Sequence, residues 1–315
     1  MKITVLDAIT LGADLDLSPL SSVGDVTVYQ STSPEEVAER IADTDVVVLN
    51  KIKLNRDNMA NAKNLKLICV AATGYDNIDL EYCREAGIQL SNVVGYSTNS
   101  VAQVTVATVL ELITHIREYN SYVVSGEYTR LGVANKVSPV YHELAGKTWG
   151  IVGLGNIGKK VAAIAEAFGC RVLAFKRTPD ENYNCVDLET LCRESDIISI
   201  HTPLNDSTRG LIGERELSLM KDTAILYNAA RGAVTDEKAV AEAILNGKIG
   251  AFGCDVYSTE PFPADHPFVN IKELSNVCLT PHMAWASAEA RKLCLDEMIE
   301  NIKAYQKGVK RNAIT

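Results

Sequence analysis

The sequence lacks the features that mark several classes of protein. Its 315 residues contain no uninterrupted apolar run near the roughly 18 residues that a membrane span needs. No long apolar stretch follows the N-terminal residues 1–7, so we expect no secretory signal. The 20 glycines and 9 prolines recur without a period, which excludes a collagen-like or low-complexity chain. A hydrophobic content of 47% is ordinary for a packed soluble protein and excludes global disorder.

Positive charge is scarce as well. The chain has 31 Lys and Arg against 40 Asp and Glu, which gives a formal net charge of −9. A protein that binds a nucleic-acid backbone needs a basic face, so we expect no nucleic-acid partner. An acidic chain can still hold an anionic metabolite in a local basic pocket.

Paired cysteine motifs are missing too. None of the eight cysteines forms a C-x-x-C pair, and several stand inside apolar runs such as Leu67-Ile68-Cys69-Val70. This pattern argues against a disulfide framework and against a zinc site, so we expect no metal. Reduced cysteines in a core predict a cytoplasmic protein.

Short β-branched runs alternate with helical stretches along the chain. The first series of expected strands comprises Ile3–Leu6, Val26–Tyr29, Val46–Leu49, Leu67–Val70 and Ile88–Leu90. The second series comprises Thr148–Val152, Arg171–Phe175, Asp196–Ile200, Thr223–Tyr227, Gly250–Asp255 and Val277–Leu279. Continuous apolar strands that alternate with helices indicate parallel sheets covered on both faces. The sequence therefore predicts an α/β protein with two doubly wound parallel-sheet lobes.

Three helical segments have recognisable limits. Ser33-Pro34-Glu35-Glu36 offers a cap, a proline and two acids, so a helix is expected to start there. A long helix is expected from about Ser100 to Asn120, between the two series of strands. A terminal helix is expected from about Ser287 to Gln306, with Gly308 beyond its end.

The sharpest local motif is Gly153-Leu154-Gly155-Asn156-Ile157-Gly158. This G-x-G-x-x-G pattern is weak evidence alone, but it follows an apolar strand and precedes a helical stretch. In such a loop the glycines make a tight turn, let a pyrophosphate approach the backbone and let the helix pack on the strand. A glycine-rich turn without a ligand is the alternative. The context favours dinucleotide binding.

The end of the next strand bears on the choice of dinucleotide. An acid there would bind the ribose 2′-hydroxyl of NAD, but the sequence reads Phe175-Lys176-Arg177-Thr178. Because cations accept the 2′-phosphate of NADP, we expect either NADP(H) or NAD(H) to bind, with NADP(H) favoured. The alternative is a solvated basic turn that tolerates both.

Polar residues follow three strands of the second series. Arg231, Glu260 and His282 each come after a strand, and ligands of open α/β sheets bind at the carboxyl ends of strands. Arginine binds a carboxylate with two hydrogen bonds and polarises a carbonyl. Histidine transfers a proton, and a neighbouring carboxylate favours its charged form. Each residue alone also fits a structural role, as do the other four histidines.

Together these motifs resemble the D-isomer-specific 2-hydroxyacid dehydrogenase family. The resemblance covers essentially the whole chain. It rests on the glycine loop and on the segments Asn228-Ala229-Ala230-Arg231-Gly232, Glu260-Pro261, Pro281-His282-Met283-Ala284-Trp285 and Ala72-Thr73-Gly74-Tyr75. Within the family, the Asp7…Thr10 start and the Pro-His-x-Ala-Trp ending most resemble glycerate dehydrogenases, also called hydroxypyruvate reductases. Two positions depart from the common pattern, because Lys176 replaces a frequent acid and Gln103-Val104 replaces a frequent Glu-His.

The resemblance implies a fold, a site and a reaction. It implies a Rossmann cofactor domain, residues 99–285, inserted in a flavodoxin-like substrate domain of residues 1–98 and 286–315, and a homodimer through the cofactor domain. Arg231, Glu260 and His282 match the substrate arginine, the glutamate that orients the histidine and the acid/base histidine. The backbone of Thr73 and Gly74 matches a loop that holds the substrate carboxylate. The remaining positions that line the cofactor are Thr202, Pro203, Ala229, Ala230, Asp255, His282 and Ala284.

The expected reaction reduces a small 2-keto acid with NAD(P)H to a D-2-hydroxy acid. Hydroxypyruvate or glyoxylate is the expected substrate, and another D-2-hydroxyacid dehydrogenase is an alternative. A formate dehydrogenase is less favoured, because formate oxidation releases no hydroxyl proton for a Glu-supported histidine. A regulated phosphoglycerate dehydrogenase is less favoured too, since no extra domain follows residue 315. The family also includes dinucleotide-sensing corepressors, so a non-enzymatic protein is the second class of function.

Overall fold

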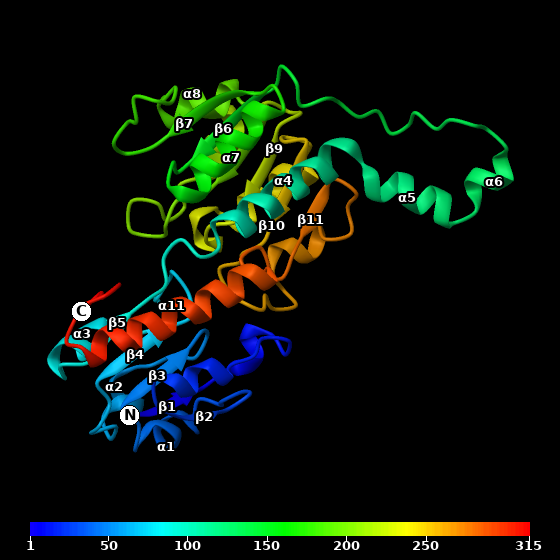
Figure 1. The fold of residues 1–315 in the computed structure, drawn as a ribbon. Helices are drawn as coiled ribbons and strands as arrows, with labels where there is room; N and C mark the ends of the chain where they lie inside the picture. The colour runs from blue at the N-terminus through cyan, green and yellow to red at the C-terminus, as the bar shows by residue number, and fades with distance from the viewer. The chain divides into compact units, whose positions relative to one another are not determined.

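The computed structural model describes all 315 residues, and they form two compact units. Residues 1–97 and 286–315 form unit 1, and residues 98–285 form unit 2. Figure 1 shows the elements of both. None of the helices is long and apolar enough to cross a membrane.

Unit 1 contains a five-stranded parallel sheet in the order β2-β1-β3-β4-β5. The strands are β1 (Lys2–Val5), β2 (Asp25–Val28), β3 (Val46–Leu49), β4 (Leu67–Val70) and β5 (Gln89–Ser91). The helices are α1 (Val37–Ile41), α2 (Arg56–Met59), α3 (Leu80–Glu85) and α11 (Ala288–Gln306), with 3-10 turns η1 (Ala8–Leu11) and η2 (Ser18–Ser22). Every residue of β3 and β4 is buried, as their β-branched and apolar sequence requires.

Two layers of helices enclose the central strands of unit 1. Buried side chains of α1, α2 and α3 join one core cluster with Leu49 and Val70 of the sheet. Helix α11 packs against β4, so the last helix of the chain completes a sheet that the first hundred residues begin (Figure 1).

Unit 2 contains a six-stranded parallel sheet in the order β11-β10-β9-β8-β6-β7. The strands are β6 (Thr148–Val152), β7 (Arg171–Phe175), β8 (Ile197–Ile200), β9 (Ile225–Asn228), β10 (Ala251–Cys254) and β11 (Val277–Leu279). The helices are α4 (Thr98–Thr114), α5 (Ile116–Val124), α6 (Glu127–Leu131), α7 (Asn156–Ala167), α8 (Leu188–Glu194), α9 (Glu214–Leu219) and α10 (Glu237–Leu245), with η3 (Gly232–Val234) and η4 (Pro267–Asn270). The strand order reverses between β6 and β8, which is where open α/β sheets bind ligands.

Helices cover both faces of the unit 2 sheet. Buried side chains of α4 and α7 form one cluster against it, around Trp149. Those of α8, α9 and α10 form another, around Phe252. Burial on both faces explains why the strands read as continuous apolar runs rather than as alternating ones. The α/β class with two parallel sheets, predicted from the sequence, is confirmed.

Two predicted helices differ from the observed ones. The helix expected from about Ser100 to Asn120 ends at Thr114, because His115 has a left-handed φ of 53° and a second helix, α5, starts after it. The helix expected at Ser33 begins at Val37, since residues 34–36 form a turn before it. A left-handed residue other than glycine stops a helix without any sequence signal as strong as glycine or proline.

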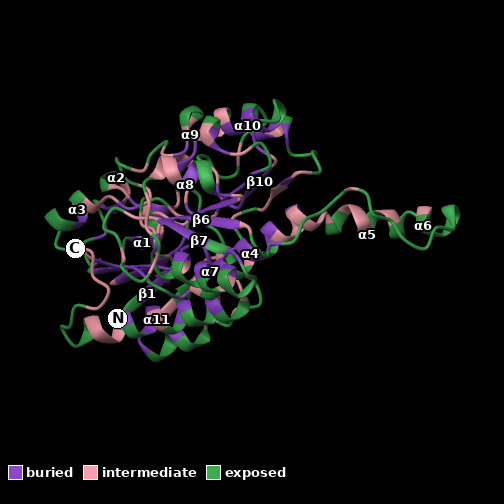
Figure 2. Cartoon of the chain, turned by 90° about the horizontal axis from the view of Figure 1, so that it is seen from above, coloured by how far each residue is buried: buried purple, intermediate pink, exposed green.

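Helices α5 and α6 and the following connection form an arm of unit 2, residues 115–143. In Figure 1 it runs away from the unit 2 sheet, and Figure 2 shows that almost none of it is buried. Large apolar side chains are exposed along it, among them Val124 at 78%, Val137 at 80% and Val140 at 69%. No pattern in the sequence predicted this arm.

Candidate active site

The glycine loop joins β6 to α7. Gly153 has a φ of 99°, and a Cβ there would lie 2.6 Å from the backbone nitrogen of Thr202. A Cβ on Gly158 would lie 2.2 Å from the carbonyl oxygen of Gly153, so these two glycines are required by the protein itself. Gly155 differs, because nothing lies within 4 Å of its would-be Cβ. This open approach to the backbone fits a bound pyrophosphate.

Helix α7 supplies the matching electrostatics. It begins at Asn156, and no side chain caps its N-terminus at Gly155. The first N–H groups of a helix have no partner inside it, and they carry partial positive charge. Gly155 and these N–H groups of α7 therefore form an arrangement into which a dinucleotide phosphate fits.

The cationic turn follows β7, whose last carbonyl, that of Phe175, accepts the N–H of Gly153 at 2.9 Å. Lys176 is half-buried and Arg177 is exposed. An acid close behind them along the chain, Asp180, already pairs with Lys159 Nζ of α7 at 2.7 Å. Its hydrogen bond to that ammonium holds the pKa of the Asp180 carboxyl at about 2. The turn thus presents two cations, while this acid is paired with a lysine of α7.

The loop after β8 carries Thr202 and Pro203, and its backbone lies against Gly153. His201 comes just before them. Its Nε2 lies 3.0 Å from Ser199 Oγ, and burial lowers the pKa of the imidazole to about 3. His201 is therefore neutral at physiological pH, in keeping with the structural role that the sequence suggested for it.

The turn that carries Arg231 is closed by Asn228, the last residue of β9. Asn228 Oδ1 accepts the N–H of Ala230 at 3.0 Å, and its Nδ2 donates to the carbonyl of Arg231 at 3.0 Å. Asn228 is fully buried. The sequence analysis gave Asn228 no role, although a polar residue at the end of a buried strand is the signal that could have shown it.

Gly232 brings the Arg231 turn against the next site loop. A Cβ on Gly232 would lie 2.0 Å from the carbonyl carbon of Tyr257 and 2.1 Å from the nitrogen of Ser258. The segment 257–260 that leads to Glu260 therefore touches the backbone beside Arg231. Strands β9, β10 and β11 are neighbours and parallel, so the residues that follow them share one edge of the sheet.

Glu260 and His282 form a direct pair. The distance from His282 Nδ1 to Glu260 Oε2 is 2.6 Å, and both side chains are about three-quarters buried. The other oxygen, Glu260 Oε1, accepts the N–H of Tyr257 at 3.1 Å. The carboxylate thus fixes the ring orientation of His282, which leaves Nε2 as the ring nitrogen for proton transfer.

Asp255 shapes the backbone on both sides of His282. Its carboxylate accepts the N–H groups of Met283 and Ala284, each at 2.9 Å, and the hydroxyl of Thr280 at 2.6 Å. His282 itself has a left-handed φ of 53°. Burial raises the pKa of Asp255, while hydrogen bonds and the nearby histidine oppose that rise. The residue predicted to line the cofactor also holds this turn in place.

The predicted substrate loop belongs to unit 1, after β4. Thr73 Oγ1 donates to the carbonyl of Val93 at 2.8 Å, and Asn92 Nδ2 donates to the carbonyl of Thr73 at 2.7 Å. Gly74 is half-buried. These bonds fix the loop at the carboxyl edge of the unit 1 sheet, while the other predicted site residues all belong to unit 2.

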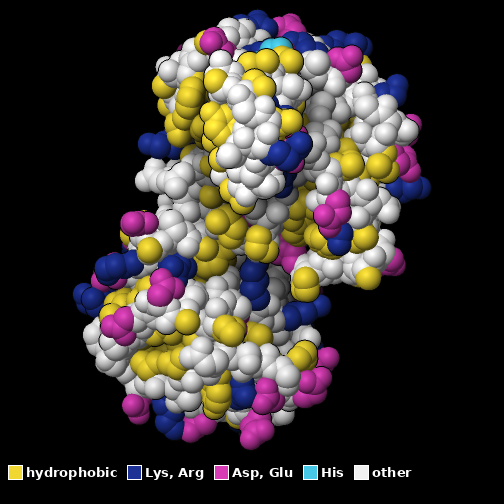
Figure 3. All heavy atoms as spheres, turned by 90° about the vertical axis from the view of Figure 1, so that its right-hand side faces the viewer, with side chains coloured by type: hydrophobic (Ala, Val, Ile, Leu, Met, Phe, Trp, Pro, Cys, Tyr) yellow, Lys and Arg dark blue, Asp and Glu magenta, His cyan; other side chains and the backbone are white.

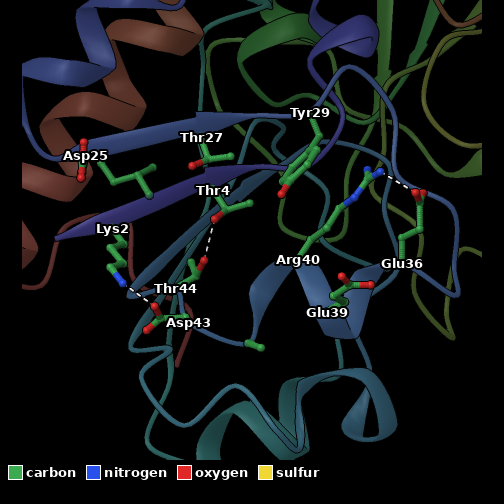
Figure 4. Close-up of a pocket in the computed structure, with 12 residues that line it drawn as sticks. Lys2, Thr4, Asp25, Thr27, Tyr29, Glu36, Glu39, Arg40, Asp43 and Thr44 are labelled. Carbon is green, nitrogen blue, oxygen red and sulfur yellow. Dashed lines mark hydrogen bonds and ion pairs between the residues drawn. The ribbon is translucent and has the colours of Figure 1, made fainter.

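A separate pocket of about 660 Å³ lies in unit 1, beside β1, β2 and α1. Figure 4 shows that its charged side chains pair with one another: Lys2 with Asp43, and Arg40 with Glu36. None of the predicted site residues lines it. Both of its cations, Lys2 and Arg40, are thus already paired with acids, so this pocket is a weaker candidate for an anionic ligand than the edge of the unit 2 sheet.

Comparisons with known proteins find a matching family model, similar curated proteins and similar solved structures. Residues 106–284 match the model of the D-isomer specific 2-hydroxyacid dehydrogenase family, NAD binding domain. A hydroxypyruvate reductase of Blautia hydrogenotrophica is 37% identical over 323 residues, covering 100% of this chain and 99% of that one. A glycerate dehydrogenase of Methylorubrum extorquens is 37% identical over 287 residues, covering 91% and 90%. A solved acyclic imino acid reductase in complex with NADPH and D-Arg has a TM-score of 0.88 and 31% identity, covering 100% of both chains.

Proposed function

The chain belongs to the D-isomer-specific 2-hydroxyacid dehydrogenase family, and from that premise we propose that it reduces hydroxypyruvate or glyoxylate with NAD(P)H. The products are the corresponding 2-hydroxy acids, D-glycerate and glycolate. The observation that carries the proposal is the 2.6 Å pair of Glu260 and His282, at the edge of the sheet that also bears Arg231 and the glycine loop.

In this proposal, some residues of the site bind the substrate and others transfer the proton. The guanidinium of Arg231 binds the substrate carboxylate with two parallel hydrogen bonds and polarises the keto group. The backbone of Thr73 and Gly74, in unit 1, is proposed to bind a carboxylate as well. His282 Nε2 donates a proton to the keto oxygen as that oxygen gains negative charge, and Glu260 stabilises the charged ring at Nδ1. Bound at the glycine loop, the reduced nicotinamide cofactor supplies the hydride.

NADP(H) is the proposed preferred cofactor. Lys176 and Arg177 stand at the end of β7, where a carboxylate would select NAD. The first acid after them, Asp180, is occupied by Lys159. One structural neighbour carries NADPH and two others carry NAD, so this comparison supports binding of a nicotinamide dinucleotide without a preference.

The arm of unit 2 supports a homodimer. Nineteen large apolar side chains are exposed in the chain, and nine of them lie on residues 115–143. Figure 3 views the molecule from the arm side and shows hydrophobic side chains gathered on the face presented there. Exposed apolar surface of this kind marks a protein interface, and a second copy of the chain is the proposed occupant.

A cytoplasmic location is proposed from the cysteines. All eight are free thiols, and six of them are buried. Burial raises the pKa of the Cys69 and Cys192 thiols to about 12, which keeps them unreactive. Reduced, buried cysteines fit a reducing compartment.

The decisive experiment is a substrate panel. Purified protein is mixed with NADPH or NADH and with hydroxypyruvate, glyoxylate, pyruvate or phosphohydroxypyruvate, and the absorbance of the reduced cofactor is followed. We expect the highest kcat/KM with hydroxypyruvate or glyoxylate. If only another 2-keto acid is reduced, the proposed substrate is wrong and the proposed type of reaction still holds. Tight dinucleotide binding without turnover on any acid would favour the dinucleotide-sensing alternative.

A further inference from the structure

A buried carboxylate on α10 holds the loop that carries Glu260. Glu237 is the first residue of α10, after the capping residue Asp236. Its side chain accepts the N–H of Ser258 at 2.8 Å, the hydroxyl of Ser258, and Nε2 of His266 at 3.0 Å. The Glu237 side chain is only 10% exposed. We call Glu237, Ser258 and His266 the loop clamp.

The hydrogen bonds of His266 define which ring nitrogen carries the hydrogen. Nδ1 accepts the N–H of Phe268 at 3.2 Å and so caps η4. Nε2 must then donate to Glu237, because one ring nitrogen of a neutral imidazole donates and the other accepts. The side chain is 6% exposed and stacks on Phe262, with ring centroids 4.9 Å apart. His266 is therefore locked in one orientation.

The loop clamp holds the loop that carries Glu260 at two points. Ser258 stands two residues before Glu260, and His266 stands six residues after it, and a single carboxylate holds both. The backbone of Ser258 also touches Gly232, beside Arg231. Movement of this segment would thus displace Glu260 relative to His282, whose orientation depends on a 2.6 Å contact.

We propose that Glu237 and His266 are positioning residues that act through Glu260 on the proton transfer at His282. The inference rests on the proposed function, since it concerns the efficiency of that reaction. Displacing a catalytic group by about 1 Å can cost on the order of 100-fold in rate, so a clamp remote from the substrate has a measurable effect. Neither residue is among those proposed to bind the substrate.

The first test variant is Glu237→Gln, which keeps the shape of the side chain. It replaces one acceptor oxygen with an amide NH2 group, which cannot accept hydrogen bonds from Ser258 and His266. We expect kcat for reduction of the best 2-keto acid to fall about 10- to 100-fold. The KM for the dinucleotide should stay within about twofold of the wild-type value. The pH at which kcat is half-maximal should differ from that of the wild type. The matched control is Glu242→Gln on the same helix, because Glu242 is 60% exposed and lies 3.8 Å from Lys238. The control should behave as the wild type.

The second variant, His266→Asn, separates two roles of the histidine. Asparagine is a good N-cap, so its oxygen can still accept the N–H of Phe268, while the bond to Glu237 is lost. We expect the same fall in kcat and the same change in the pH profile as for Glu237→Gln. This variant also keeps the test decisive if Glu237→Gln does not fold.

A double-mutant comparison shows whether the loop clamp acts through Glu260. In a Glu260→Gln background, Glu237→Gln should lower kcat less than about threefold, because the contact that it protects is already weakened. An equal loss in both backgrounds would overturn the proposal, as would folded variants with the kcat and pH profile of the wild type. Failure of the wild type to reduce any 2-keto acid would instead contradict the proposed function, before any variant is made.

Discussion

At the scale of single residues, the candidate site includes a histidine in an unusual backbone conformation. His282 occupies the left-handed region that non-glycine residues rarely adopt, and Asp255 holds the two N–H groups that follow it. The sequence pointed to Arg231, Glu260 and His282 because their chemistry is conspicuous after apolar strands. It did not point to Glu237, because hydrogen bonds to Ser258 and His266, far along the chain, leave no local pattern. Asn228 bonds to Ala230 and Arg231 nearby, and its only sequence signal was a polar residue at the end of a buried strand.

Replacing His282 tests the proton donor. His282→Ala should lower kcat for 2-keto acid reduction about 100- to 10,000-fold, the usual contribution of a general acid. Dinucleotide affinity, measured by fluorescence titration, should change little, because the glycine loop is intact. The control is Lys238→Ala, which removes an exposed side chain of the same unit outside the arm. An unchanged kcat would remove His282 from the mechanism.

Replacing both cations after β7 tests the cofactor preference. The double variant Lys176→Ala/Arg177→Ala should raise the KM for NADPH about 10- to 100-fold, since charged hydrogen bonds to the 2′-phosphate are lost. The kcat/KM for NADH should change less than about threefold. Lys248→Ala/Lys272→Ala removes two exposed lysines of unit 2 and serves as the control. A wild type that strongly prefers NADH would contradict the proposed preference for NADP(H).

At the scale of secondary-structure elements, the interiors of strands were predictable and the ends of helices were not. Buried parallel strands are continuous apolar runs, so all eleven were located within two residues at either end. The break at His115 depends on a backbone conformation that side-chain periodicity does not encode. Helix α1 starts later than expected because residues 34–36 form a turn. A cap residue and a proline occur at such a turn as well as at the start of a helix, so the sequence did not distinguish the two.

The connection between β7 and α8 is tied to α7 by the Lys159–Asp180 pair, and this contact predicts a dependence on pH. The folded state lowers the pKa of Asp180 to about 2, so the pair stabilises the protein above the pKa of an unfolded aspartate, near 4. That contribution is lost as the pH falls from about 4 to 2. Asp180→Asn should lower the Tm by about 1–2 °C at pH 7, because Lys159 is 44% exposed and water weakens the pair.

The same Tm difference should become small near pH 2, where about half of the wild-type carboxyl is protonated. Differential scanning calorimetry of both proteins from pH 7 to pH 2 measures it. A Tm difference that stays constant down to pH 2 would show that the substitution acts through packing rather than through charge.

At the scale of the whole molecule, the two units followed from the alternation of strands and helices. The division of the first unit between both ends of the chain came from the family resemblance, and the arm came from neither. The sequence analysis placed the domain limits at residues 98/99 and 285/286, and the compact units meet at 97/98 and 285/286. The arm escaped notice because its apolar residues have no sheet of their own unit to cover. Exposed apolar surface of this kind marks an interaction site, which the periodicity of a single sequence does not display.

Disrupting the arm tests the proposed dimer. Val124→Asp/Val137→Asp places two charges on side chains that are 78% and 80% exposed. The wild type should have the mass of a dimer by light scattering, and the variant should shift to monomer at micromolar concentration. Val28→Asp, at a 42% exposed valine of unit 1, should leave the mass unchanged. A monomeric wild type, or a variant that remains dimeric, would contradict the assignment of the arm.

The division of unit 1 between the two ends of the chain has a consequence for synthesis on the ribosome. When residues 1–97 have emerged, the sheet they form lacks the helix α11 that packs against β4, because about 190 residues of unit 2 separate them. Unit 2 is continuous and can fold as soon as it leaves the exit tunnel. At about 5–20 residues per second, the nascent unit 1 therefore keeps apolar strands uncovered for some ten seconds or more. Chaperones that bind exposed apolar segments should meet this chain at its first hundred residues.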